Sequence, residues 1–100
     1  MADRVTLSPE AVADVRRVRA WYTQAGAGKR ARARLLSVLS AIDGLAEDAQ
    51  RWPLDTLCPG TRMRVVEEHV IRFQIIERPP GVERVYVHRI FGPGMERTRA

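Results

Sequence analysis

The order of apolar and polar residues has two different periods along the chain. Val5 and Leu7 alternate with polar neighbours, which predicts a short strand. From Ser8 to residue 22, and again from 30 to 46, apolar residues recur every three or four positions, as they do on one face of a helix. Ser8 suits a helix N-cap and Pro9 a first helical residue. The glycine-rich segment 24–28 separates the two helices, so the pattern predicts a helical hairpin.

After residue 61 the apolar residues recur every second position, which is typical of strands. Strands are expected at 62–66, 70–77 and 82–91, with tight turns at 67–69 and 78–81. Consecutive strands joined by short turns pair antiparallel. We therefore predict an α+β fold in the order β-α-α-β-β-β, with the helical hairpin packed on one face of a small, mainly antiparallel sheet. The chain is expected to be one domain over 1–100, in which 92–100 form a flexible basic tail.

The alternation also predicts which strand residues face the helices. The expected core face consists of Met63, Val65, Ile71, Phe73, Ile75, Val85 and Val87. Arg62, Arg64, Arg72 and Gln74 would then share the outer face. This cluster is either a solvated surface or a binding surface, and we favour the second interpretation.

Charge and cysteine content indicate which partners and which structural sites to expect. The formal net charge is +5, and every basic residue except Lys29 is arginine, which favours an acidic partner. An arginine-rich codon usage would explain that preference but not the positions of the arginines. Cys58 is the only cysteine, so neither a disulfide framework nor a cysteine zinc site is expected. We expect no metal, no cofactor, no membrane span and a cytoplasmic location.

Three segments together resemble one protein family. They are "LSPEAVADVRRVRAWY" (7–22), "GTRMRVVEEHVIRFQI" (60–75) and "VYVHRIFG" (85–92). Their order and spacing are similar to those of the RelE/ParE toxins of type II toxin–antitoxin systems. The resemblance implies a small inhibitor of bacterial growth that is neutralised in a complex with a cognate antitoxin. RelE-like members cut messenger RNA on the ribosome, and ParE-like (plasmid stabilisation) members poison DNA gyrase.

The two branches differ in the chemistry that they need. Metal-free RNA cleavage requires a general base, a general acid and cations that stabilise the phosphorane. His88 is the best acid or base candidate, although a strand histidine bonded to a neighbour is the alternative. His69 is expected to be a solvated turn residue. Arginines replace the lysines of RelE-like nucleases at positions 62 and 64, and the C-terminal tail has no tyrosine.

These departures favour a ParE-like toxin that binds DNA gyrase over an enzyme. The alternatives are a ribosome-dependent ribonuclease, with the ribosome and mRNA as partners, and a non-toxic member that binds an antitoxin and represses its operon. Trp21 lies off the apolar stripe of its helix and is a candidate contact. The residues predicted to bind a target or the antitoxin are Trp21, Arg62, Arg64, Arg72 and Arg89.

Overall fold

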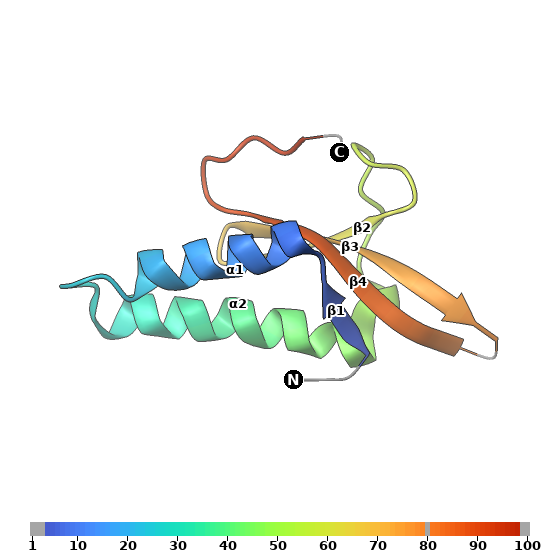
Figure 1. Cartoon of the computed structure of the whole chain (residues 1–100), viewed down its shortest axis with the longest axis horizontal. Helices are drawn as coiled ribbons and strands as arrows, with labels where there is room; N and C mark the ends of the chain where they lie inside the picture. The colour runs from blue at the N-terminus through green and yellow to red at the C-terminus, as the bar shows by residue number, and fades with distance from the viewer. Residues whose placement is uncertain (1–3, 80, 99–100) are drawn as a thin grey trace.

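The computed structural model describes residues 4–79 and 81–98 (Figure 1). The elements in chain order are β1 (Val5–Leu7), α1 (Pro9–Tyr22), α2 (Gly28–Asp48), the 3-10 turn η1 (Ala49–Arg51), β2 (Arg62–Val66), β3 (His69–Arg78) and β4 (Gly81–Phe91). This order, and the packing of the two helices on a sheet, confirm the predicted α+β fold. Neither helix in the described part of the chain has the length and apolarity that a membrane span requires.

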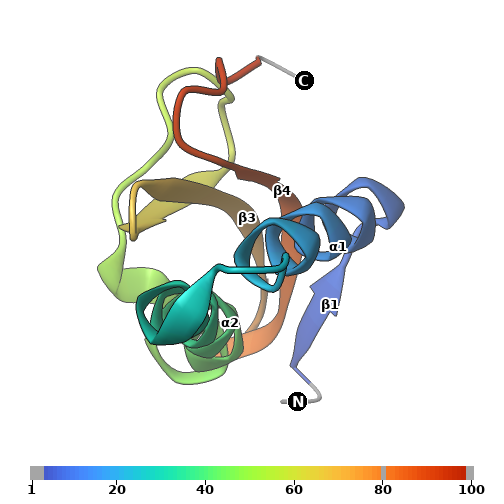
Figure 2. The same ribbon diagram turned by 90° about the vertical axis from the view of Figure 1, so that its left-hand side faces the viewer.

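The sheet has four strands in the order β1-β4-β3-β2. β1 runs parallel to β4, and the other neighbours are antiparallel. Figure 2 shows α2 inside the curve of the sheet and α1 beside β4. The core lies between these layers, and its fully buried members include Val38, Leu45, Ile71, Phe73 and Ile90. The far end of the helical hairpin extends away from the sheet (Figure 1).

α1 begins where the sequence predicts, because Ser8 caps it. The Ser8 hydroxyl oxygen accepts a hydrogen bond from the backbone N–H of Ala11. The same hydroxyl donates to the carbonyl oxygen of His88, 2.7 Å away. Ser8 therefore both starts the helix and fixes that start against β4.

The turn between β2 and β3 is one residue shorter than the alternation suggests. It consists of Glu67 and Glu68, which have positive φ angles of 50° and 62°, while Val66 pairs with His69. Positive φ at both central residues is the mark of a type I′ hairpin turn. His69 consequently begins β3 and is only 2% exposed. The expectation that His69 is a solvated turn residue is wrong.

This shift by one residue exchanges the two faces of β2. Arg62 pairs with Phe73 and Arg64 pairs with Ile71, and directly paired residues share a face of the sheet. Phe73 and Ile71 are buried in the core. Arg62 and Arg64 therefore lie on the helix side rather than on the outer face.

The other members of the predicted faces move accordingly. Met63 pairs with Arg72 on the outer face, and Val65 is 60% exposed, so placing either apolar residue in the core is wrong. Gln74 is exposed on the outer face, as expected. The single arginine cluster predicted for that face does not form, because only Arg72 of the three hairpin arginines remains there.

A bulge in β4 changes which side chains of this strand reach the core. Phe73 pairs with Val87 and Arg72 pairs with Arg89, so His88 is an extra residue between two pairs. A bulge re-aims the residues that follow it. Ile90 consequently lies opposite Ile71 and is fully buried, although alternation alone places it on the face opposite Val87.

Residues 92–98, which belong to the segment predicted as a flexible tail, return over the outer face of the sheet. The Arg97 guanidinium lies 3.1 Å from the Asp55 carboxylate and 3.1 Å from the Met63 sulfur. The backbone N–H of Gly92 lies 3.2 Å from the Met95 sulfur. Residues 99 and 100 lie outside the described residues.

Candidate binding surfaces

Arg62 and Arg64 join β2 to the helix side of the molecule. The Arg64 guanidinium lies over the Trp52 ring, 4.4 Å from its centroid, and 3.6 Å from the Asp48 carboxylate. Arg62 donates to the carbonyl oxygen of Trp52 over 2.6 Å. Both side chains are partly buried. In this arrangement they hold the loop that contains Trp52, and little of either guanidinium is left for a partner.

Arg72 is buried on the outer side of the sheet. Its side chain is 1% exposed, and its Nε donates to the Asp55 carboxylate over 2.9 Å. Its guanidinium also lies 5.0 Å from the centre of the Phe91 ring. Nη1 and Nη2 are buried without a hydrogen-bond partner among the described residues. Arg72 is thus a structural cation in the described fold, and a partner reaches it only if the covering segments move.

Asp55 is the centre of this buried polar group, although its sequence context gives no sign of it. Its side chain is fully buried and accepts hydrogen bonds from Arg72, from Arg97 and from the backbone N–H of Leu57. Burial alone would raise the pKa of Asp55, but these donors and the two arginine charges lower it below its ordinary value. Asp55 is therefore ionised at neutral pH and compensates the charge of Arg72.

A second buried carboxylate, that of Asp14, joins α1 to the part of β4 that extends beyond β1. Its two oxygens accept hydrogen bonds from Arg17, Arg89 and the backbone N–H of Ile90, each 2.8 Å away. Arg17 also donates to the carbonyl oxygen of Ile90 over 2.9 Å. Asp14 and Arg17 thus satisfy the backbone of β4 on the edge opposite β3, past the point where β1 ends. Arg89, a predicted binding residue, is thus an ion-pair partner of Asp14.

Stability should fall in acid because both buried carboxylates have lowered pKa values. Burial raises the pKa of Asp14, but its hydrogen bonds from Arg89, Ile90 and Arg17 lower it overall. A carboxylate with a folded-state pKa below the unfolded value of 3.8 stabilises the protein above that value. We expect these carboxylates to make the urea midpoint fall progressively below about pH 4.

The control for this acid dependence is Glu47→Gln, since Glu47 is an exposed carboxylate on α2. Glu47→Gln should keep the wild-type slope of stability against pH, whereas Asp55→Asn should flatten it. Urea unfolding followed by circular dichroism above and below about pH 4 measures both. Equal slopes for wild type and Asp55→Asn would contradict this assignment.

His88 lies in the β4 bulge with its side chain partly exposed. Its Nε2 is hydrogen-bonded to the Gln74 side-chain oxygen over 3.1 Å, and its ring stands edge-on to Tyr86 with centroids 4.9 Å apart. Burial and the nearby Arg72 charge lower the pKa of His88, against a smaller opposing effect of Glu10. The imidazole is therefore neutral at pH 7. Of Arg62, Arg64, Arg72 and Arg89, only Arg72 contributes to this shift of the pKa.

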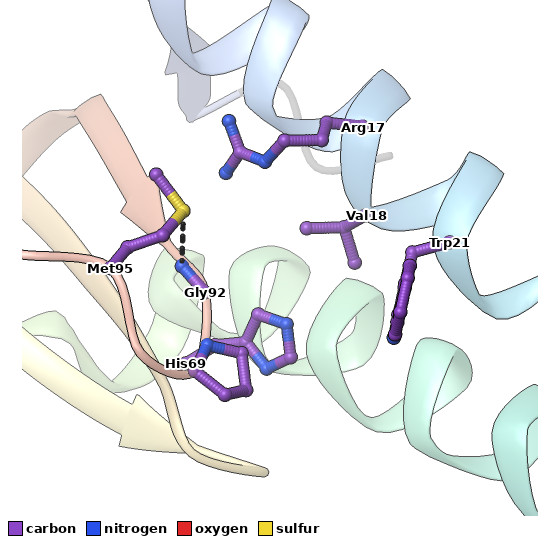
Figure 3. Close-up of a pocket in the computed structure, with 7 residues that line it drawn as sticks. Arg17, Val18, Trp21, His69, Gly92 and Met95 are labelled. Carbon is purple, nitrogen blue, oxygen red and sulfur yellow. Dashed lines mark hydrogen bonds between the residues drawn. The ribbon is translucent and has the colours of Figure 1, made fainter.

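Trp21 lines a cavity between α1 and the segment that follows β4. Its side chain is 65% exposed, as its position off the helical stripe predicts. Figure 3 shows Trp21, Val18 and Arg17 of α1 facing His69, Gly92 and Met95 across this cavity of about 280 Å³. His69 Nδ1 donates to the carbonyl oxygen of Glu67 over 2.7 Å, which fixes the ring in the cavity wall. The cavity is mostly apolar, with one arginine at its edge.

Within the described residues, no cluster of three or more histidine, cysteine, aspartate or glutamate side chains could hold a metal ion. Cys58, the one thiol, is partly buried.

Among the comparisons with known proteins, only the one with solved structures finds a similar protein. No family model and no curated protein matches the chain. Among solved structures, the chain is similar to one from "Chromosomal ParDE TA system from P. aeruginosa", with a TM-score of 0.68 and 15% sequence identity. The similarity covers 89% of this chain and 94% of the other. At this identity, the similarity shows that the two chains share a fold.

Proposed function

We propose that this protein is the toxin of a type II toxin–antitoxin system, of the ParE-like type, which inhibits bacterial growth by poisoning DNA gyrase. The observation that carries the proposal is the fold shared with a chain of a ParDE system over nearly the full length of both chains. The order and spacing of the three segments quoted above support it from the sequence.

The arrangement of the arginines supports a binding protein rather than a ribonuclease. Metal-free RNA cleavage needs cations placed around the scissile phosphate together with an acid and a base. Arg64 stacks on Trp52, Arg72 is paired with Asp55, and Arg89 is paired with Asp14. These side chains contribute to the fold, which leaves the partly exposed His88 without a matching set of cations.

A cognate antitoxin is the expected partner, and the Trp21 cavity suits it. An apolar side chain of a partner segment fits between Trp21, Val18 and Met95, and an acidic neighbour of that side chain would lie near Arg17. Aromatic anchors in such cavities carry much of the energy of an interface. The resulting complex would be a toxin–antitoxin hetero-oligomer.

Co-expression with the product of the neighbouring reading frame tests this partner. The two proteins should copurify, and Trp21→Ala should weaken the complex by about 2 kcal/mol or more. Val65→Ala is the matched control, because Val65 is 60% exposed on the other side of the molecule. If the proteins do not copurify, or if both variants weaken the complex equally, the proposed interface is wrong.

The alternative is a RelE-like, ribosome-dependent ribonuclease that uses His88. The observation in its favour is the lowered pKa of His88 beside the Arg72 charge, which keeps a base available at neutral pH. Induction in a bacterial host separates the two targets. Gyrase poisoning predicts a DNA-damage response while translation continues, whereas mRNA cleavage predicts a fast stop of translation with intact DNA.

His88→Ala should leave growth inhibition nearly unchanged if the toxin acts by binding. The imidazole is peripheral and its hydrogen bond to Gln74 is exposed, so its loss removes little from an interface. A ribonuclease that relied on this histidine would lose about 10²–10⁴-fold in rate. Growth after induction, with circular dichroism to confirm folding, measures the effect. A folded His88→Ala protein that no longer inhibits growth would favour the ribonuclease.

A further inference from the structure

The outer part of the helical hairpin, between Val15 and Ile42, carries more than the whole of the protein's net positive charge. Between Val15 and Ile42 the chain has seven basic residues and no acidic residue. The other ten basic and twelve acidic residues leave the rest of the chain with a formal charge of −2. The seven basic residues, all exposed, are Arg16, Arg17, Arg19, Lys29, Arg30, Arg32 and Arg34.

Five of these seven cations lack a counter-ion among the residues that the structure describes. Arg17 is paired with Asp14 at 2.8 Å, and Arg34 lies 3.8 Å from Glu67. For the other five, no ion pair is formed with any residue that the structure describes. A segment with this charge and no acidic neighbour attracts polyanions.

The first turn of α2 carries positive side chains at the positive end of the helix dipole, which is an unfavourable arrangement. Its N-cap is Ala27, which supplies no side-chain hydrogen bond, and its first turn has no acidic residue but contains Lys29 and Arg30. Unpaired N–H groups and the positive end of the dipole favour anions at this position, so cations there lower stability. α1 has the favourable arrangement, with a Ser8 cap and Glu10 in its first turn. A bound phosphate would remove the unfavourable feature of α2.

An exposed aromatic ring lies beside two of these cations, Arg30 and Arg34. Trp21 borders a second hollow, of about 300 Å³, between the ends of the two helices, and Gln24, Arg30 and Arg34 also line it. The Trp21 side chain is 65% exposed, which is unusual for a large aromatic residue without a ligand. An accessible ring beside cations can stack on an unpaired base while the cations bind its phosphates.

We infer that the end of the helical hairpin binds single-stranded nucleic acid. Its phosphates would contact the N-terminus of α2 with Lys29, Arg30 and Arg34, and a base would stack on Trp21. Trp21 is the one residue shared with the proposed antitoxin cavity. The inference does not depend on toxicity, since a non-toxic protein with this hairpin would bind in the same way.

The residues at the end of the hairpin favour single-stranded over duplex nucleic acid, but they do not distinguish DNA from RNA. A base can reach the Trp21 ring only if it is not already stacked in a duplex. The charged side chains would donate to phosphate oxygens, which DNA and RNA share. DNA and RNA single strands should therefore bind alike, and a blunt duplex should bind more weakly.

The binding experiment uses the full chain with labelled oligothymidylate, oligouridylate and a DNA duplex of equal length, followed by fluorescence anisotropy. The two single strands should bind with a dissociation constant of about 10⁻⁴–10⁻⁶ M near physiological salt. Three phosphate contacts would give a slope of log K against log salt of about −2, since each contributes about −0.7. The intrinsic tryptophan fluorescence should also be quenched.

Two variants separate the phosphate contacts from the stacking. Arg30→Gln should reduce the salt slope by about 0.7. Arg51→Gln is its charge-matched control and should not, because Arg51 follows the other end of α2, roughly 30 Å away. Trp21→Ala should weaken binding about 5- to 150-fold and abolish the quenching, while leaving the salt slope unchanged.

A stability measurement tests the α2 N-terminus independently. Lys29→Glu should raise the melting temperature of the free protein by about 1–8 °C, because it replaces an unfavourable charge with a favourable one. The same variant should bind the oligonucleotides less tightly. The proposal is overturned if single strands bind no better than the duplex or than polyglutamate, or if the hairpin variants bind as the wild type does.

Discussion

Asp55→Ala should destabilise the protein by about 3–5 kcal/mol, a large share of the 5–15 kcal/mol typical of small domains. The reason is the burial of its partner. The Arg72 side chain is 1% exposed, and Asp55 supplies its only ion pair in the described structure. Removing the carboxylate leaves a buried cation without compensation, and it also removes the acceptor of the Leu57 N–H and of Arg97. Urea unfolding followed by circular dichroism measures the loss.

A double variant identifies the buried charge as the cause. Asp55→Ala/Arg72→Met should recover much of the stability lost in Asp55→Ala, because an apolar side chain of similar length replaces the unpaired cation. Arg97→Ala should cost far less, since Arg97 is partly exposed and Arg72 remains paired. If the double variant is as unstable as the single one, the loss arises from the loop around Asp55 rather than from the charge of Arg72.

Asp14→Ala should have the second largest effect, about 3 kcal/mol. The substitution leaves the buried N–H of Ile90 without an acceptor and removes the ion-pair partner of Arg89. It also releases α1 from the edge of β4. Unfolding in urea measures the loss, and proteolysis should show earlier cleavage in α1.

The control for Asp14 is Arg17→Ala, which removes a half-exposed partner of the same carboxylate. Its cost should not exceed about 1 kcal/mol, because Asp14 still accepts from Arg89 and Ile90. Equal losses for Asp14→Ala and Arg17→Ala would show that the carboxylate does not hold the edge of β4.

The helices and the order of the elements could be predicted because local signals agree with the final packing. Ser8 and Pro9 mark the start of α1, and apolar residues at spacings of three and four mark both buried faces. The exposure of Trp21 follows from the same periodicity. In each case the signal lies within one element, so no long-range information is needed.

The faces of β2 could not be predicted, because they depend on the length of one turn. Glu67 and Glu68 adopt positive φ angles, although type I′ turns favour asparagine, aspartate and glycine. A three-residue turn fits the alternation of Met63 and Val65 better, but the two-residue turn places Arg64 over Trp52 instead. The energy of packing Arg64 on Trp52 cannot be inferred from the alternation of apolar and polar residues in β2.

The buried ion pairs were also hidden from sequence analysis. Asp14 and Asp55 lie 75 and 17 residues from Arg89 and Arg72, and nothing near them in the chain indicates which arginines they bind. The β4 bulge at His88 could not be predicted from the sequence either, because no glycine occurs there. Arginines that were predicted to form one binding surface are therefore distributed among three structural contacts.

The central claim is that this protein is a growth-inhibiting toxin neutralised by an antitoxin. Its most direct test is growth of a bacterial culture after induction of the chain alone and together with the neighbouring reading frame, with the empty vector as a control. We predict arrest with the wild-type chain, relief on co-expression and no arrest with the empty vector. Undiminished growth while the folded wild-type protein accumulates would contradict the account.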